Sequence, residues 1–249
     1  MATQQRKRQK PSPPLTGSLH RQPKRRAKRG TGEQRILDAA AIFFAEQGFR
    51  ASTRDLARRL GVTQALLYRY FPSKQALIDR VFETIYLEPW DAALTERLLD
   101  PIVPLGTRLT EFYTVVARRS TPTRSRLFMR AGLDDQGLAE RYTFPLNDRI
   151  LTPVVIALRH EAGLPTVKTA PLLRAERELA MTLHGAIAHL NIRKNIYGSP
   201  LPDDLGEHVA FYIACFLEGA VSTIRRIHEK APGRFLAKPL GGRKGTPIE

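Results

Sequence analysis

Cysteine is nearly absent from this sequence, which has a single one at Cys215. One thiol excludes an internal disulfide framework and any zinc site built from several cysteines. Long apolar runs are also lacking. The longest, Val209 to Leu217, is far shorter than the roughly 20 residues that span a bilayer. The basic N-terminus has no apolar segment of the secretory type, so we expect a cytoplasmic protein that has no contact with a membrane.

Motifs of catalysis and metal binding are missing too. The sequence contains no HExxH, no CxxC, no glycine-rich phosphate loop and no serine or cysteine in a recognised nucleophile motif. His184 and His189 are five residues apart, which turns them to different faces of a helix and away from a shared metal ion. We therefore expect no metal, no cofactor and no enzymatic activity. An effector-binding enzyme with an incidental N-terminal domain is a rival hypothesis that no catalytic residue supports.

Positive charge is abundant and unevenly distributed. The formal net charge is +16, and ten of the 40 basic residues but none of the 24 acidic ones lie in residues 1–30. This segment therefore carries +10, and the other 219 residues together carry +6. Lysine and arginine near phosphates release condensed counterions, so double-stranded DNA is the expected partner. A solvated tail that only aids solubility is the alternative explanation of the same charge.

Composition divides the chain into four segments. Residues 1–30 are rich in Pro, Gln, Ser, Lys and Arg, residues 231–249 repeat Gly, Pro and Lys, and both are expected to be disordered. Between them apolar residues recur at helical spacing, without an alternating strand pattern of useful length. We expect an all-α protein, with a three-helix helix-turn-helix domain at 31–77 and a larger helical ligand-binding and dimerisation domain at 78–230.

Start and stop signals predict the helix-turn-helix. Thr31 is expected to cap the first helix, Ser52 or Thr53 the second, and Thr63 the third. Gly61 allows the positive φ of a tight turn between the last two helices. A small apolar core is expected from Phe43, Phe44, Leu56, Leu60, Val62, Leu67 and Phe71. The opposite face of the third helix, with Gln64, Ala65, Tyr68 and Arg69, is expected to enter the major groove of DNA.

The segment from Arg35 to Leu77 resembles the DNA-binding domain of the tetracycline-repressor (TetR) family. The likeness lies in the AAIFFAEQGF end of the first helix, the STRDLA start of the second, and the run GVTQALLYRYFPSKQAL. The resemblance implies that Thr53, Tyr68 and Lys74 contact the DNA backbone. It implies that Arg54, Gln64, Ala65 and Tyr70 face bases. It also implies a homodimer on a pseudo-palindromic operator, because each helix-turn-helix domain, called the head below, reads one half-site.

The two C-terminal helical segments predict the dimer interface. The run from Val209 to Leu217 has no charged residue, and a helix that is apolar all round must be buried on more than one side. A symmetry-related copy is the simplest second partner, which the resemblance also implies. The alternative is a pair of interior helices in a monomer. The expected interface residues are Leu183, Ile187, Leu190, Val209, Ile213, Phe216 and Ala220.

The middle of the chain combines apolar residues with a few polar groups, which is typical of a small-molecule pocket and equally of a helical core. The expected lining residues are Phe112, Val116, Phe128, Met129, Phe144, Val154 and His184. These patterns together predict a dimeric, sequence-specific DNA-binding transcriptional regulator. We expect a repressor that an unidentified small-molecule effector releases from its operator. The alternative is an effector-independent nucleoid or architectural protein that uses the same head.

Deletion of residues 1–30 is expected to weaken non-specific DNA binding, because it removes ten basic groups next to the first helix. The slope of log affinity against log salt concentration should shrink accordingly. Fluorescence anisotropy with a random duplex at several salt concentrations measures this slope for the full and shortened chains. Equal slopes would show that the segment does not contact phosphates.

Overall fold

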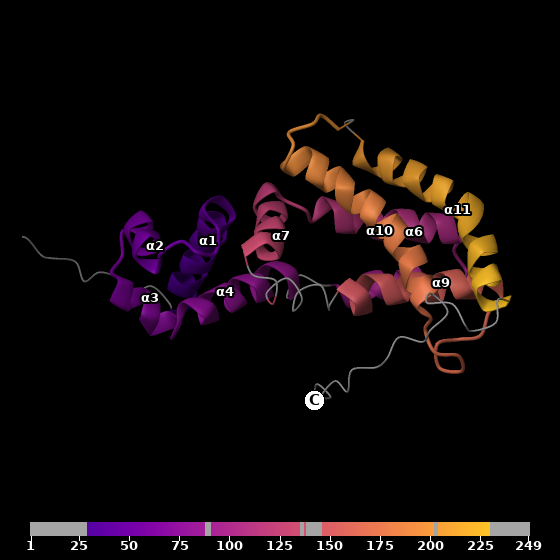
Figure 1. The fold of residues 1–249 in the computed structure, drawn as a ribbon, viewed down its shortest axis with the longest axis horizontal. Helices are drawn as coiled ribbons and strands as arrows, with labels where there is room; N and C mark the ends of the chain where they lie inside the picture. The colour runs from indigo at the N-terminus through magenta and orange to yellow at the C-terminus, as the bar shows by residue number, and fades with distance from the viewer. Residues whose placement is uncertain (1–28, 88–90, 135–136, 138–145, 202–203, 230–249) are drawn as a thin grey trace, which may run out of the picture.

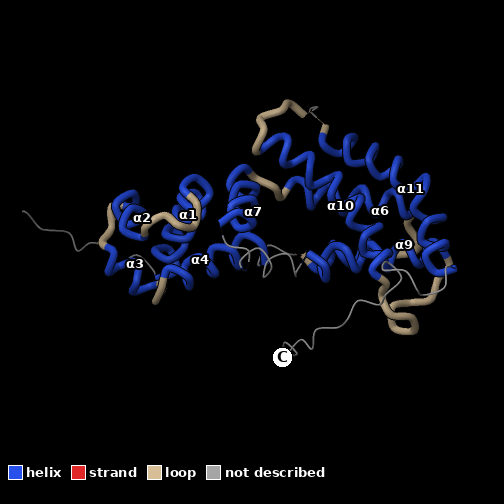
Figure 2. The backbone as a smooth tube through the Cα atoms, viewed as in Figure 1, coloured by secondary structure: helices blue, strands red, loops and turns tan. Residues whose placement is uncertain are grey.

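The computed structural model describes residues 29–87, 91–134, 137, 146–201 and 204–229. Helices joined by loops make up this part of the chain, and no β-strand occurs within it (Figure 2). The expected all-α class is confirmed. The expected disordered segments at both ends lie outside the described residues, apart from Arg29 and Gly30. None of the described helices is long and apolar enough to cross a membrane.

The N-terminal part of the molecule contains α1 (Arg29–Gln47), α2 (Thr53–Leu60), α3 (Gln64–Tyr70) and α4 (Lys74–Phe82). Figure 1 shows these helices grouped at one end of an elongated molecule, in indigo and violet. Helices α2 and α3 contact each other, and α1 packs against both α2 and α4. The predicted helix-turn-helix is therefore present in the structure.

Local capping explains the boundaries of the short helices. The side chains of Ser52, Thr63 and Ser73 accept backbone N–H groups at 3.0–3.2 Å at the starts of α2, α3 and α4. Gly61 ends α2 with φ 65°, the left-handed conformation that glycine adopts without a steric penalty. The predicted caps at Ser52 and Thr63 are confirmed. The predicted cap at Thr31 is wrong, because α1 already begins two residues earlier, at Arg29.

The N-terminal hydrophobic core extends beyond the helix-turn-helix to include α7 (Pro122–Asp134). Leu127 and Ala131 of α7 are buried among the apolar side chains of α1 and α4. Asp134 accepts a hydrogen bond from the backbone N–H of Phe49 at 3.0 Å. Arg130 donates to the backbone carbonyl of Glu46 at 3.3 Å. Helix α7 therefore joins the two ends of the molecule.

The other described helices pack around a separate hydrophobic core, called the second core below. These elements are η1 (Glu83–Leu87), α5 (Ala92–Leu99), α6 (Leu105–Arg118), η2 (Asn147–Leu151), α9 (Thr152–Ala162), α10 (Arg174–Asn195) and α11 (Leu205–Glu229). The π-helical turn η1 continues α4, and η2 leads into α9. Helix α11 packs along α6, α10 and α9. Helical spacing of apolar residues predicts helices at 73–87, 105–119, 146–162, 172–196 and 203–229, and these ranges contain every element of this group except α5.

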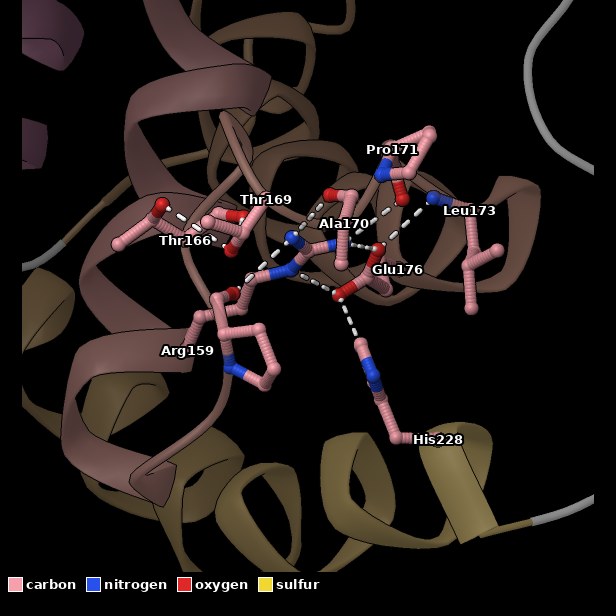
Figure 3. A network of polar contacts seen from close by, with 9 residues as sticks. Arg159, Thr166, Thr169, Ala170, Pro171, Leu173, Glu176 and His228 are labelled. Carbon is pink, nitrogen blue, oxygen red and sulfur yellow. Dashed lines mark hydrogen bonds and ion pairs between the residues drawn. The ribbon is translucent and has the colours of Figure 1, made fainter.

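A buried polar network fixes the loop between α9 and α10 (Figure 3). The guanidinium of Arg159 makes two 2.6 Å hydrogen bonds to the carboxylate of Glu176, and both residues are almost fully buried. The same guanidinium donates to the carbonyl oxygens of Pro165, Ala170 and Pro171. His228, in the last turn of α11, bonds the carboxylate at 2.8 Å. Three separate elements therefore converge on one ion pair.

The environment of Glu176 lowers the pKa of its carboxyl below the ordinary 4.5. Burial raises this pKa, but hydrogen bonds from Arg159, from His228 and from the backbone N–H of Leu173 outweigh burial. A lowered folded-state pKa means that the pair stabilises the fold above pH 4.5 and loses this effect as the pH falls through the folded value. The network should therefore contribute to acid sensitivity.

Replacement of Arg159 by methionine is expected to lower the free energy of unfolding at pH 7 by about 3–5 kcal/mol, because it leaves a buried carboxylate without its cation. Urea denaturation followed by circular dichroism measures this change. The matched control is Arg97→Met, which breaks the half-exposed pair with Glu111 and should cost less than about 1 kcal/mol. Equal losses for the two variants would contradict the assignment of a stabilising role to the buried network.

Candidate nucleic-acid interface and cavity

Helix α3 has one buried and one exposed face, as a helix that enters a DNA groove requires. Leu67 points into the N-terminal core. Ala65, Tyr68 and Arg69 are exposed on the other side. Arg54, at the first turn of α2, is exposed as well. The described structure thus presents a polar and basic surface on the two helices of the helix-turn-helix.

Thr53 differs from the other expected DNA contacts because it is only 7% exposed. Its hydroxyl accepts a hydrogen bond from the side-chain amide of Gln64 at 3.0 Å and lies 3.0 Å from the hydroxyl of Tyr68. A hydroxyl has one donor, so Thr53 can donate to Tyr68 while it accepts from Gln64. In this arrangement the phenolic O–H of Tyr68 stays available as a donor to an external acceptor such as a phosphate.

Tyr70 and Lys74 are partly buried at the end of α3 and the start of α4. A Cβ atom built on Gly32 would lie 2.7 Å from the hydroxyl of Tyr70. Tyr70 therefore packs closely over the first turns of α1, where a larger residue would displace it.

A cavity of about 220 Å³ lies next to α7 on the side away from the N-terminal core. Residues from η1, α6, α7, η2 and α10 form its wall. The lining residues are Tyr86, Val116, Ser120, Arg124, Ser125, Phe128, Met129, Leu146, Arg149, Ile150, His184, Ile187, Ala188, Asn191 and Ile192. An apolar wall with a few polar groups is the usual composition of a small-molecule site.

Four of the expected pocket residues, Val116, Phe128, Met129 and His184, line this cavity. Phe112 of α6 and Val154 of α9 do not line it, because both side chains are buried in the second core. Phe144 lies outside the described residues. Burial lowers the pKa of His184 to about 4, so its ring is neutral at pH 7.

Three chemically important wall residues were not predicted from the sequence: Tyr86, Arg124 and Arg149. The phenolic O–H of Tyr86 donates to the backbone carbonyl of Arg124 at 2.5 Å. The guanidinium of Arg124 lies 4.4 Å from the centre of the Tyr86 ring. No motif marks these residues, because an arginine on an amphipathic helix normally indicates a solvated face.

The structure corrects the expected dimer interface. Six of the seven expected residues are below 3% exposed inside the single chain: Leu183, Ile187, Leu190, Val209, Ile213 and Ala220. Only Phe216 is partly accessible. The most apolar stripe of α10 and of α11 packs against the rest of the same chain, because burial of this stripe removes the most apolar surface from water. The outward stripes carry Thr182, Gly185 and His189 on α10, and Phe211, Ala214, Cys215, Gly219 and Ser222 on α11.

Comparisons with known proteins agree on the N-terminal part. Residues 36–81 match the sequence profile described as "Bacterial regulatory proteins, tetR family". The transcriptional repressor KstR2 of Rhodococcus jostii is 45% identical over 47 residues, which are 18% of this chain and 23% of that protein. The nucleoid occlusion factor SlmA of Haemophilus ducreyi is 38% identical over 77 residues, 28% of this chain and 37% of that protein. The chain thus matches well under half the length of these relatives.

Solved structures extend the likeness to the whole fold. A TetR-like transcriptional regulator from Rhodococcus sp. RHA1 has a TM-score of 0.58 at 20% identity and covers 78% of this chain and all of its own. AmtR of Mycobacterium smegmatis has a TM-score of 0.54 at 24% identity and covers 83% and 98%. At such identities the likeness concerns the fold. The profile match likens residues 36–81 to bacterial regulatory proteins of the tetR family, and the structural comparisons show that the chain shares the fold of such regulators.

Proposed function

We propose that this protein is a homodimeric, sequence-specific DNA-binding transcriptional repressor that a small molecule releases from its operator. The observation that carries the proposal is the exposed face of α3 on a helix-turn-helix whose sequence matches the tetR family. A regulatory role also suits a chain with a cavity next to α7, the helix that packs into the core of the head.

In the proposed complex, α3 lies in the major groove. Arg54 and Gln64 read base edges, since both side chains can form paired hydrogen bonds. Ala65 and Tyr70 lie close to the bases. Tyr68 and Lys74 contact phosphates, with Arg69 beside them on the exposed face. Thr53 acts through Gln64 and Tyr68, because its buried hydroxyl is hydrogen-bonded to both.

The proposed dimer forms through the outward stripes of α10 and α11. Gly185 and Gly219 would let helices approach closely, since no other described part of the chain beyond their own helix turns lies within 4 Å of a Cβ placed there. Phe211, which is 67% exposed, provides apolar area for the contact. A two-fold dimer would hold two heads about 34–36 Å apart, or a multiple of that spacing, on one face of the DNA.

The effector is proposed to act through α7 and η1. Phe128 and Met129 of α7 line the cavity, while Leu127 and Ala131 of the same helix belong to the head's core. A ligand that moves α7 or η1 would therefore move the heads without touching α3. Such a ligand must have a higher affinity for the conformation in which the spacing of the heads does not fit DNA than for the conformation in which it does.

A second candidate function is an effector-independent role at the nucleoid. The match to a nucleoid occlusion factor over 77 residues favours it, although that match covers 37% of that protein. Mapping of the bound sites across the genome separates the two functions. A few promoters next to regulated genes support the repressor, whereas many sites spread along the chromosome support the nucleoid role.

Base-reading and phosphate-contacting residues are expected to respond differently to substitution. Arg54→Ala should weaken binding to the preferred duplex by about 1–3 kcal/mol, with little effect on a scrambled duplex. Lys74→Ala should weaken binding to both duplexes and lower the salt slope by about one. Anisotropy titrations with a duplex selected from a random library measure both effects. Equal losses on the two duplexes for Arg54→Ala would remove Arg54 from the base-reading residues.

The outward stripe of α11 is expected to control the oligomeric state. Phe211→Asp and Gly219→Arg should give folded monomers with at least tenfold weaker operator binding, because each places a charge or bulk in the proposed contact. Sedimentation velocity and anisotropy test this. The control is Ile102→Asp, which changes another apolar residue that is 89% exposed but lies between α5 and α6. Dimers in both α11 variants would place the interface elsewhere.

A further inference from the structure

The charges in the cavity wall point to a class of ligand. Arg124 of α7 and Arg149 of η2 are the charged residues among the described residues of the wall, and no aspartate or glutamate is present there. Eight of the lining residues are apolar aliphatic or aromatic side chains: Val116, Phe128, Met129, Leu146, Ile150, Ile187, Ala188 and Ile192. An apolar space with two cations disfavours a positively charged ligand and favours an anion with an apolar body.

The guanidinium of Arg124 lacks a carboxylate partner among the described residues. It donates one 2.6 Å hydrogen bond to the carbonyl oxygen of Ile85 and lies over the ring of Tyr86. Burial lowers the pKa of Arg124, Tyr86 opposes this change, and the nearby Arg119 adds to it, so the charge of Arg124 is only partly compensated. Arginine presents a planar fork of N–H donors that matches a carboxylate with two parallel hydrogen bonds. A carboxylate in the cavity would compensate this charge.

A second polar group of the wall, His184, has one ring nitrogen without a hydrogen-bond partner among the described residues. His184 lines the cavity, and its Nδ1 atom is buried with no hydrogen bond. Its ring is neutral at pH 7, so it can offer one N–H donor and one acceptor nitrogen. Buried polar atoms are normally hydrogen-bonded. A ligand with a polar group besides its acid would therefore find a partner in His184.

We propose that the effector is a small organic acid, with a carboxylate that binds Arg124 and Arg149 and an apolar body that packs against the aliphatic and aromatic wall. The inference rests on the proposed function, because it names the chemistry of the effector that the repressor would sense. The cavity of about 220 Å³ is many times larger than the ~10–15 Å³ that a single water molecule needs. Acids of the size of benzoate or hexanoate match this volume.

The position of Arg124 connects acid binding to the head. Its backbone carbonyl accepts from Tyr86, and its guanidinium bonds Ile85, so two hydrogen bonds join α7 to η1. Because η1 continues α4, these bonds join the cavity wall to the helix that leaves the DNA-binding head. A carboxylate that draws the guanidinium into the cavity breaks its bond to Ile85 and its contact with the Tyr86 ring. The end of α4 is then free to shift relative to α7.

Matched acids and amides test the charge requirement. Isothermal titration calorimetry of the full chain is run with benzoate, phenylacetate and hexanoate, and with benzamide, phenylacetamide and hexanamide. At least one acid is expected to bind at least tenfold more tightly than the amide of the same shape. Amides that bind as tightly as their acids, or the absence of binding by all three acids, would overturn the proposal.

Variants of the two arginines test the site. Arg124→Gln and Arg149→Gln should each weaken acid binding at least tenfold and leave amide binding within about twofold. Arg126→Gln is the control, because Arg126 is an exposed arginine of the same helix that does not line the cavity. Circular dichroism establishes that each variant is folded, and Arg149→Gln serves alone if Arg124→Gln unfolds. Unchanged acid binding in a folded Arg149→Gln or Arg124→Gln variant would place the acid elsewhere and overturn the proposal.

DNA binding separates failure of this inference from failure of the proposed function. Anisotropy with the selected duplex is measured with and without the acid that binds. The acid should weaken wild-type DNA binding at least tenfold, and it should have no effect on Arg124→Gln. If the protein binds the duplex but the acid does not release it, the effector class is wrong and the DNA-binding role stands. If no duplex is preferred over random DNA, the proposed function fails, whatever the calorimetry shows.

Discussion

The packing of Leu127 and Ala131 into the N-terminal core joins the two ends of this molecule. Residues four apart lie on the same face of a helix. Leu127 and Ala131 therefore share the face of α7 that is buried in the head, while Arg124 and Phe128 share the face that forms part of the cavity wall. A close-packed core transmits small displacements because it has few voids to absorb them. A movement of α7 on the cavity side must therefore also shift α1 and α4.

The helix-turn-helix could be predicted from sequence because its signals are local. Ser52, Thr63 and Gly61 act within a few residues of their own position, and the structure has them where the sequence predicted them. The start of α1 could not be placed in this way. Thr31 is a good capping residue, but helical residues already precede it, so capping preference alone does not decide where a helix begins. Helix α5 was missed because its eight residues bury only Leu94 and Leu98.

The surfaces were harder to predict than the helices. Hydrophobic periodicity identifies the buried stripe of a helix but not what buries it. For α10 and α11 the stripe through Ile187 and Ile213 packs within the chain, although the same apolar pattern also suits contact with a partner copy. For the cavity, part of the wall could be predicted from the sequence, but its charged residues could not. Val116 and His184 were expected in its wall, but Arg124 was not, because its importance depends on contacts with Ile85 and Tyr86 about 40 positions away.

The hydrogen bonds that the Thr53 hydroxyl shares with Gln64 and Tyr68 have a consequence for the evolution of operator preference. A proposed base-reading residue and a proposed phosphate-contacting residue share one hydroxyl, so substitutions at these three positions should not be additive. A new binding specificity would not arise by exchange of α3 residues alone. Thr53, on the neighbouring helix, would have to change with them, and paralogues that read different operators should differ at all three positions together.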